Sequence, residues 1–157
     1  KPFFHTSSMK VANSAKVSVF VRKNENKEEI LKGLISLFPF SLEENKINVQ
    51  RTVAEGVFHD KIQIFEIFVE KEKLVNMFIE NLLNNLGKNH VKVLKEQKES
   101  RLDSESNFFI RIEKDYFIMQ NKMQLTDTGN CYHIKINIAA FPKKRENAMK
   151  VVEKILG

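Results

Sequence analysis

The sequence has few of the residues that crosslink, interrupt or loosen a chain. Among its 157 residues are one cysteine, three prolines, five glycines and no tryptophan. A single cysteine excludes an internal disulfide and a thiolate metal cluster, which is typical of proteins from a reducing compartment. The scarcity of proline and glycine argues against long flexible linkers. Disorder is therefore expected only at the ends of the chain.

Long apolar stretches are also absent. No apolar run approaches the roughly 20 residues that cross a bilayer, and the first residues lack the apolar core and cleavage site of a secretion signal. We therefore expect no membrane association and a cytoplasmic location.

Motifs for catalysis or cofactor binding are missing as well. The sequence contains no glycine-rich phosphate loop and no paired metal-ligand spacing. Cys131 and His133 share one side of an expected strand, but no third group is evident to orient them, and a partly buried cysteine is the ordinary explanation. We expect no cofactor, no metal and no enzymatic activity.

Enough apolar residues are present for one core. Residues of the hydrophobic class make up 42% of the chain, with 13 phenylalanines among them. This length suits one domain of ordinary size and is too short for two. We expect a single domain over residues 15–157, preceded by a disordered or foreign N-terminal segment over residues 1–14.

Hydrophobic periodicity predicts an α+β fold with a largely antiparallel sheet and helices packed against it. Alternation predicts strands, and spacing of three and four predicts helices. The strands are expected at Ala15–Val21, Ile47–Val53, Ile62–Val69, Phe108–Glu113 and Tyr132–Ile138. The helices are expected from a cap at Asn24 or Asn26 to Pro39, from Glu72 to Gly87, and after Pro142 at the C-terminus.

Three segments have a pattern that a simple strand or helix does not explain. The strand Ile62–Val69 is apolar on both faces, so it is expected to be central and covered on both sides, or covered by a partner. The segment Lys88–Ser100 shows neither period and is interpreted as a connection with a short helical turn. Tyr116–Met123 fits either a helical turn or an extended piece.

The net charge of +6 favours polyanionic partners. The alternative is a lysine-rich, solvated surface, which arises from base-composition bias or from the ion-pair networks of thermophiles. Net charge alone does not decide between the two.

The segment from Arg101 to Lys114 says most about function. A polar turn leads into a strand whose even-numbered apolar residues face the core, while its odd-numbered residues, Arg111 among them, face the other way. Arg101 precedes the turn and Lys114 follows the strand. Three cations are therefore predicted near one sheet edge, where a phosphate chain could lie. The alternative for Arg111 is a surface ion pair with a nearby carboxylate.

Phe109 shares the outward side of this strand with Arg111. Its ring could stack on a base. The alternative is that a helix or a second subunit covers it, as is more usual for a strand phenylalanine.

Further cations extend the prediction of a basic surface. Lys135 lies on the outward face of the last strand, and Lys143, Lys144 and Arg145 are expected in the first turn of the closing helix. Cations in a first turn oppose the helix dipole. Either they form a basic cluster for phosphate, or they are a solvated helix start that Glu146 partly balances.

The residues resemble an archaeal family described as RNA-binding and as predicted exosome subunits. The resemblance runs from about Ala15 to Leu156 and rests on the order of elements, the Asn-Glu cap region before the first helix, the Glu55-Gly56 turn, and the series Arg101, Asp103, Arg111 and Lys114. It implies the α+β fold of the ribosomal protein that binds 5S ribosomal RNA. The chain departs from the family pattern in two places. Val57–Lys61 stands where the pattern continues with Gly, Asn and Pro, and Ser106 stands where it has glycine.

We therefore expect a non-catalytic RNA-binding accessory protein that contacts the RNA backbone. Its predicted contacts are Arg101, Arg111, Lys114, Lys135, Lys143, Lys144 and Arg145, and exosome or ribosomal proteins are the expected protein partners. The alternative is a protein-interaction module, homodimeric or part of a larger complex, which uses the doubly apolar strand and the Phe surface.

Overall fold

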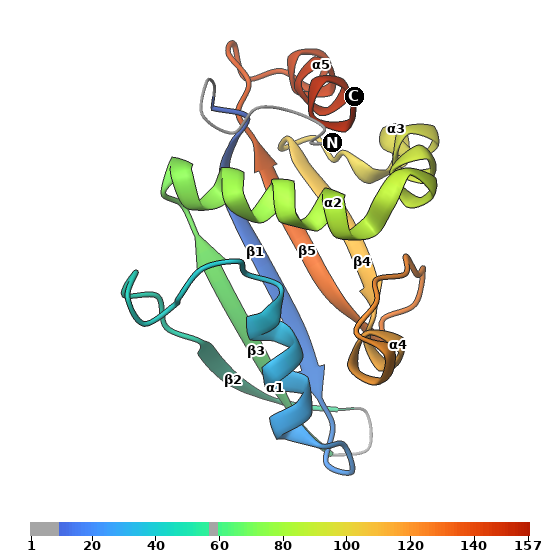
Figure 1. The fold of residues 1–157 in the computed structure, drawn as a ribbon. Coiled ribbons are helices and arrows are strands. Elements are labelled where there is room, and N and C mark those ends of the chain that lie inside the picture. The colour runs from blue at the N-terminus through green and yellow to red at the C-terminus, as the bar shows by residue number, and fades with distance from the viewer. Residues whose placement is uncertain (1–9, 57–59) are drawn as a thin grey trace.

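The computed structural model describes residues 10–56 and 60–157 and has the expected α+β fold. Five strands form one antiparallel sheet in the order β2-β3-β1-β5-β4 (Figure 1). The elements in chain order are β1 Ala12–Val21, α1 Lys27–Ser36, β2 Gln50–Glu55, β3 Lys61–Val69, α2 Glu72–Glu96, α3 Lys98–Arg101, β4 Asn107–Glu113, α4 Lys114–Gln120, β5 Cys131–Ile138 and α5 Arg145–Leu156.

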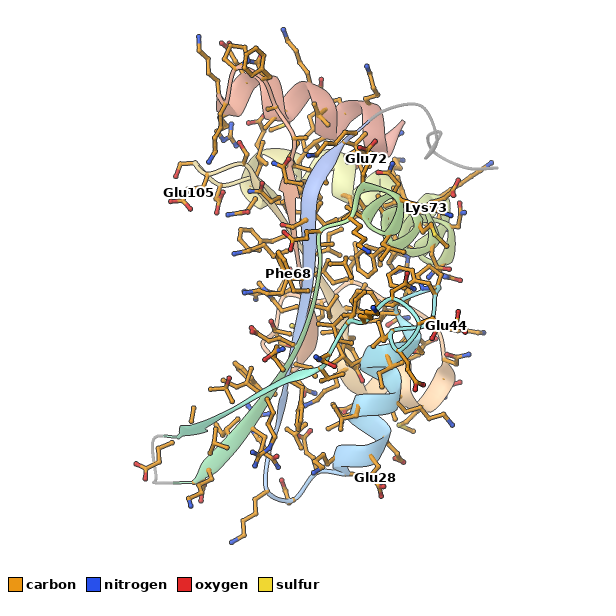
Figure 2. The ribbon with its side chains drawn as sticks, turned by 90° about the vertical axis from the view of Figure 1, so that its left-hand side faces the viewer. Glu28, Glu44, Phe68, Glu72, Lys73 and Glu105 are labelled. Carbon is orange, nitrogen blue, oxygen red and sulfur yellow. The ribbon has the colours of Figure 1, made fainter. Side chains whose placement is uncertain are left out.

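The helices cover only one face of the sheet. Figure 2 shows α1 and α2 on one side of the sheet and α5 across its end, while Phe68 and Glu105 lie on the side away from α1 and α2. Alternation within each strand produces this division: Val17, Val19 and Val21 of β1 are buried, whereas Phe20 between them is 42% exposed. The core thus lies between the sheet and a single layer of helices, and no part of residues 10–56 and 60–157 forms a layer over the second face of the sheet.

The third strand lies inside the sheet as predicted, but the prediction that this chain covers it on both sides is wrong, and the alternative of cover by a partner stays a prediction. Strand β3 is interior to the sheet, between β2 and β1. Phe65, Ile67 and Val69 are buried, but Phe68 on the other face is 45% exposed. Because helices pack on one side only, the apolar residues on the second face of β3 have no covering layer within the described residues.

The second helix breaks at Gly87, where the sequence predicts its end, and a second helical segment follows directly. Gly87 has a φ of +83°, a left-handed value that breaks the regular helix, yet helix resumes and continues to Glu96. Val91 and Leu94 lie three residues apart and are both buried, so burial of a second apolar stripe carries the helix beyond the kink. The segment 88–100 is therefore mostly helical rather than a connection.

The first helix begins as predicted. The side chain of Asn26 accepts a hydrogen bond from the backbone N–H of Glu29 at 3.2 Å, so Asn26 rather than Asn24 is the N-cap. The helix ends at Ser36, before Pro39. The predicted second strand is shifted, since β2 begins at Gln50 while Ile47 packs against the core from the preceding loop.

The folded domain begins earlier than residue 15. Val11 is fully buried and β1 starts at Ala12, so residues 11–14 belong to the domain. Residues 1–9 lie outside the described part of the chain. Over the described helices, none combines the length and apolar character that crossing a bilayer requires.

Two local features fix the packing of α1 and the turn before β4. The Tyr132 hydroxyl donates to the carbonyl of Ile30 at 2.8 Å, and a Cβ at Gly33 would overlap that hydroxyl, so glycine permits this close approach. Ser106 has a φ of +67° and is buried, in a conformation that favours glycine. This is the position where the family pattern has glycine.

Candidate nucleic-acid interface

The bare face of the sheet, here called the open face, presents outward side chains from four adjacent strands. It consists of Lys16, Ser18 and Phe20 from β1, Ile64, Glu66 and Phe68 from β3, Asn107, Phe109 and Arg111 from β4, and His133, Lys135 and Asn137 from β5. Most of these residues line a shallow groove of about 650 Å³. The odd-numbered positions of β4 and β5 face outward as the sequence predicts.

Rings are spread across this face. Phe20 and Phe68 are 42% and 45% exposed, and the rings of Phe109 and His133 lie 5.4 Å apart between centroids. Exposed rings on a sheet are the platforms on which unpaired bases stack. The sequence singled out Phe109 alone. The alternation of Lys16, Ser18 and Phe20 with buried valines was the signal that could have identified the β1 contribution.

The charges on the open face nearly balance. Three cations, Lys16, Arg111 and Lys135, share the groove with three carboxylates, Glu66, Asp103 and Glu105. Lys16 Nζ lies 3.6 Å from Glu66 Oε2, which also accepts a hydrogen bond from the Ser18 hydroxyl at 2.8 Å. A face of mixed charge suits bases, with their donors and acceptors, better than a continuous line of phosphates.

His133 lies at the centre of this arrangement. Partial burial lowers its pKa, and the positive charges of Arg111, Lys16 and Lys135 lower it further. The imidazole therefore stays neutral to a lower pH than usual. An anion that neutralised these cations would remove part of that effect and raise the pKa of His133.

Carboxamides link three strands near the Glu105 turn. Asn13 donates to Asn137, which donates to Asn107 at 2.9 Å, and Asn107 donates to Asp103 at 3.2 Å. Asp103 also accepts from the backbone N–H groups of Glu105 and Asn107. Although burial opposes it, these hydrogen bonds hold the pKa of Asp103 below its ordinary value. Asp103 therefore organises the turn that begins β4.

The outer edge of β4 is closed by backbone and side-chain hydrogen bonds. The carbonyls of Asn107, Phe109 and Arg111 accept from Asp103 N, Arg101 Nη1 and Thr126 N, all near 3.0 Å. The N–H of Glu113 donates to Gln124 O at 2.8 Å. The edge therefore offers few free backbone N–H and C=O groups with which an added strand could pair.

The structure brings together Arg101 and Arg111 beside that edge. Both line a groove of about 510 Å³ with Phe109, Asp127 and His133, which adjoins the open face. The guanidinium of Arg101 already has protein partners, because it donates to the Gln97 carboxamide as well as to the Phe109 carbonyl. Arg111 donates to the Asp127 carbonyl at 2.9 Å rather than to a carboxylate. Lys135 belongs to the open face, so these three predicted contacts converge.

The expectation that Lys114 is available to RNA is wrong. Its side chain is 1% exposed, and its ammonium lies 2.9 Å from Glu25 Oε2 and donates to the Phe20 carbonyl at 3.0 Å. Burial would raise the pKa of Glu25, but the hydrogen bonds from Lys114 and from the Arg22 N–H hold it below its ordinary value. Lys114 fastens the start of α4 to the end of β1.

The basic cluster before α5 does not join the other predicted contacts. Helix α5 begins at Arg145, so Lys143 and Lys144 precede the first turn. Arg145 lies 3.2 Å from Glu99 Oε1 and donates to the carbonyls of Glu99 and Leu102. None of the three lines either groove described above. Arg145 holds α5 to α3, and Lys143 and Lys144 are solvated.

The lone cysteine is an unreactive thiol. Cys131 is buried at the start of β5, and burial raises its pKa against the opposing effects of Arg111 and Lys114. Among the described residues, no group of three or more His, Cys, Asp or Glu side chains is arranged to hold a metal ion. His59, which stands beside Asp60 in the sequence and could bind a metal only with further ligands from elsewhere, lies outside the described residues.

Known proteins resemble this chain over nearly its whole length. A protein of Pyrococcus abyssi, RNA-binding protein PAB1135, is 26% identical over 145 residues, which cover 92% of this chain and 94% of that protein. Solved structures of two DUF54 proteins share the fold. AF2318 from Archaeglobus fulgidus has a TM-score of 0.81 at 24% identity, covering 92% of this chain and 99% of that one. For Mth689 from Methanothermobacter thermautotrophicus the TM-score is 0.74 at 22% identity, with 94% and 99% covered. The family model described as RNA binding matches residues 14–140, and the chain is therefore a member of this RNA-binding family.

Proposed function

We propose that the protein is a non-catalytic RNA-binding accessory factor in RNA processing or ribosome assembly, and that the open face receives single-stranded RNA. The observation that carries the proposal is the interleaving of exposed rings with cationic and amide side chains on one uncovered sheet face. Membership of the RNA-binding family supports RNA as the ligand. The resemblance to predicted exosome subunits supports exosome or ribosomal proteins as further partners.

Base stacking would supply most of the binding free energy on this face. Phe20, Phe109 and His133 lie on three adjacent strands, so successive bases can stack along one path across the sheet. Stacking on an aromatic side chain contributes about 1–3 kcal/mol per base. Arg111 and Lys135 flank the rings and can pair with a phosphate or with a base edge. This mode differs from the backbone binding that the sequence suggested.

The test is a binding titration with labelled single-stranded RNA of mixed sequence, followed by fluorescence anisotropy. We expect Phe109→Ala and Phe20→Ala each to weaken binding by roughly 5- to 150-fold, the range that about 1–3 kcal/mol implies. Phe141→Ala is the matched control, because Phe141 is 96% exposed and lies outside the open face. Circular dichroism establishes that each variant is folded.

Two results would contradict the proposal. The first is an intact protein that retains no RNA at low salt. The second is a pair of open-face variants that bind as tightly as the Phe141→Ala control.

Self-association is a second candidate for the same face. Phe20 and Ile64 are paired across β1 and β3, and Phe68 extends the apolar area toward Lys16. Uncovered apolar patches are typical of protein interfaces. Sedimentation at high and low salt distinguishes the two, since an apolar dimer persists in high salt whereas RNA binding weakens steeply.

A further inference from the structure

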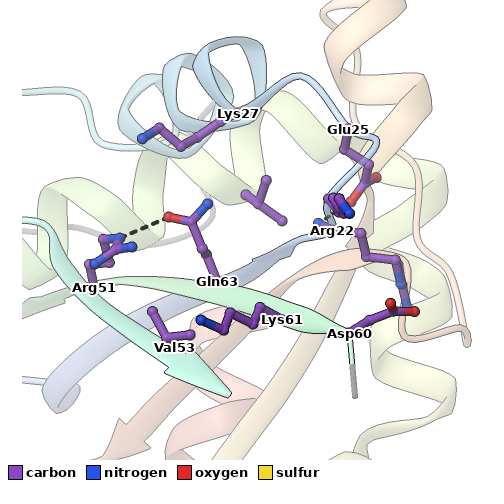
Figure 3. A pocket seen from close by; sticks show the side chains of 10 residues that line it. Arg22, Glu25, Lys27, Arg51, Val53, Asp60, Lys61 and Gln63 are labelled. Carbon is purple, nitrogen blue, oxygen red and sulfur yellow. Dashed lines mark hydrogen bonds between the residues drawn. The ribbon is translucent and has the colours of Figure 1, made fainter. Parts of the chain in front are cut away.

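A second concave site, here called the basic pocket, lies where the β1–α1 turn meets β2 and β3. Figure 3 shows side chains from these segments converging around it. The pocket has a volume of about 670 Å³. Its cations are Arg22, Lys23, Lys27, Arg51 and Lys61, and its other lining residues are Val21, Glu25, Val53, Asp60 and Gln63.

The basic pocket carries an excess of positive charge. Among the residues that the structure describes, only two carboxylates line it, Glu25 and Asp60, and Glu25 is engaged by the buried ammonium of Lys114. Within residues 10–56 and 60–157, none of the five cations forms a salt bridge. Clustered like charges repel one another, so this arrangement does not serve stability. It differs from the open face, where cations and carboxylates balance.

Two lining side chains are arranged for an anion. The Nε of Arg51 donates to Gln63 Oε1 at 2.8 Å, which orients the guanidinium. Among the described groups, its two terminal nitrogens make no hydrogen bond. Lys27 occupies the first position of α1, where a cation opposes the helix dipole. A bound phosphate would satisfy both groups.

The basic pocket and the open face lie back to back at one end of the sheet. Val21 and Gln63 face the pocket, while their neighbours Phe20 and Ile64 face the open side. Arg22 and Lys23 follow β1 directly, so they lie at the rim between the two faces. An RNA strand that leaves the open face past the end of β1 therefore meets these cations next.

We propose that the basic pocket binds backbone phosphates of the same RNA whose bases occupy the open face. This inference rests on the proposed function. The two sites bind different parts of the RNA. Bases stack on the nearly neutral open face. The basic pocket, on the helix side of the sheet, binds phosphates of the strand after it has passed round the end of the sheet. RNA long enough to reach both sites gains affinity that a short fragment lacks.

The experiment compares two oligouridines, one of about 6 and one of about 20 nucleotides, in salt titrations by fluorescence anisotropy. The pocket variant is Lys27→Gln combined with Lys61→Gln, because both lysines are exposed and neither makes a hydrogen bond or ion pair among the described residues. We expect the pocket variant to bind the long RNA roughly tenfold more weakly than the unchanged protein does at low salt. The slope of its log affinity against log salt should fall by about 1.4, or about 0.7 for each phosphate that is no longer neutralised. The short RNA should be unaffected.

The matched control is Lys150→Gln with Lys154→Gln, two exposed lysines of α5 that remove the same charge from another surface. A pocket variant that behaves like this control on the long RNA overturns the inference. Equal weakening of both RNAs also overturns it, because the pocket would then be part of the primary site. A different result would contradict the proposed function of the open face: Phe109→Ala would leave the binding of the short RNA unchanged.

Discussion

The buried ion pair between Lys114 and Glu25 allows a quantitative test of how the end of β1 is held. The Lys114 side chain is 1% exposed and that of Glu25 is 22% exposed. Replacing Glu25 by glutamine leaves the ammonium buried with only a carbonyl and an amide as acceptors. Loss of one partner from a buried pair costs about 3–5 kcal/mol. We expect Glu25→Gln to lower the free energy of unfolding by this amount.

The reverse substitution is expected to cost less. In Lys114→Met the apolar side chain fills most of the buried volume, and the carboxylate of Glu25 can still reach water. We expect a loss of about 1–3 kcal/mol. The double variant should resemble Lys114→Met alone, since the methionine no longer needs a partner. The two substitutions should therefore be coupled by about 3–5 kcal/mol, the whole cost of Glu25→Gln alone.

Acid should weaken this interaction in a defined window. The pKa of Glu25 in the folded state lies below its ordinary value of 4.5. A lowered folded pKa contributes stability that is present above the ordinary value and is lost as the pH falls through the folded pKa. Stability should therefore decline on acidification below about pH 4.5, and Lys114→Met should show less of this decline.

Urea denaturation followed by circular dichroism, at neutral pH and at several pH values below 5, measures all of these quantities. The reasoning fails if Glu25→Gln costs less than Lys114→Met. It also fails if the two losses add in the double variant, because additivity would mean that the side chains do not interact.

Two further predictions concern Ser106 and His133. Ser106→Gly should stabilise the protein by about 0.5–1 kcal/mol, because relief of the left-handed strain exceeds the added freedom of glycine in the unfolded chain; a lower midpoint in urea would contradict this. RNA bound to the open face should raise the lowered pKa of His133 toward its ordinary value of 6.5, so affinity should increase as the pH falls below about 6.5. His133→Gln should flatten that dependence, and a pH profile identical to that of the unchanged protein would exclude His133 from the site.

Local alternation predicted the faces of β4 and β5 correctly, because each side chain's side is set by its own position in the strand. Whether the outward face is covered depends on helices elsewhere in the chain. The sequence pattern of Ile62–Val69 therefore suggested cover on both sides, although the structure has one layer of helices. The break at Gly87 was predicted correctly, because a left-handed backbone is a local property. The helical segment that follows was not predicted, because it depends on burial of Leu94 in the core.

The candidate site was harder to predict, because the sequence shows which residues are charged but not which charged side chains are buried. Lys114 was interpreted as a phosphate contact from its place after a strand, but its partner Glu25 lies 89 residues away in the sequence. The basic pocket was not predicted either, because its residues are far apart in the sequence. Its cations come from three separate segments, and only the turn between β1 and α1 and the pairing of β2 with β3 bring them together.

The single layer of helices has a consequence for how this protein could change. In β4 and β5, residues that hold the domain together alternate with residues that meet solvent, so adjacent positions are subject to different selection. Substitutions at positions 109, 111, 133 and 135 could retune ligand preference at little expense to folding. A library confined to these outward positions would be a compact starting point for directed evolution of binding specificity.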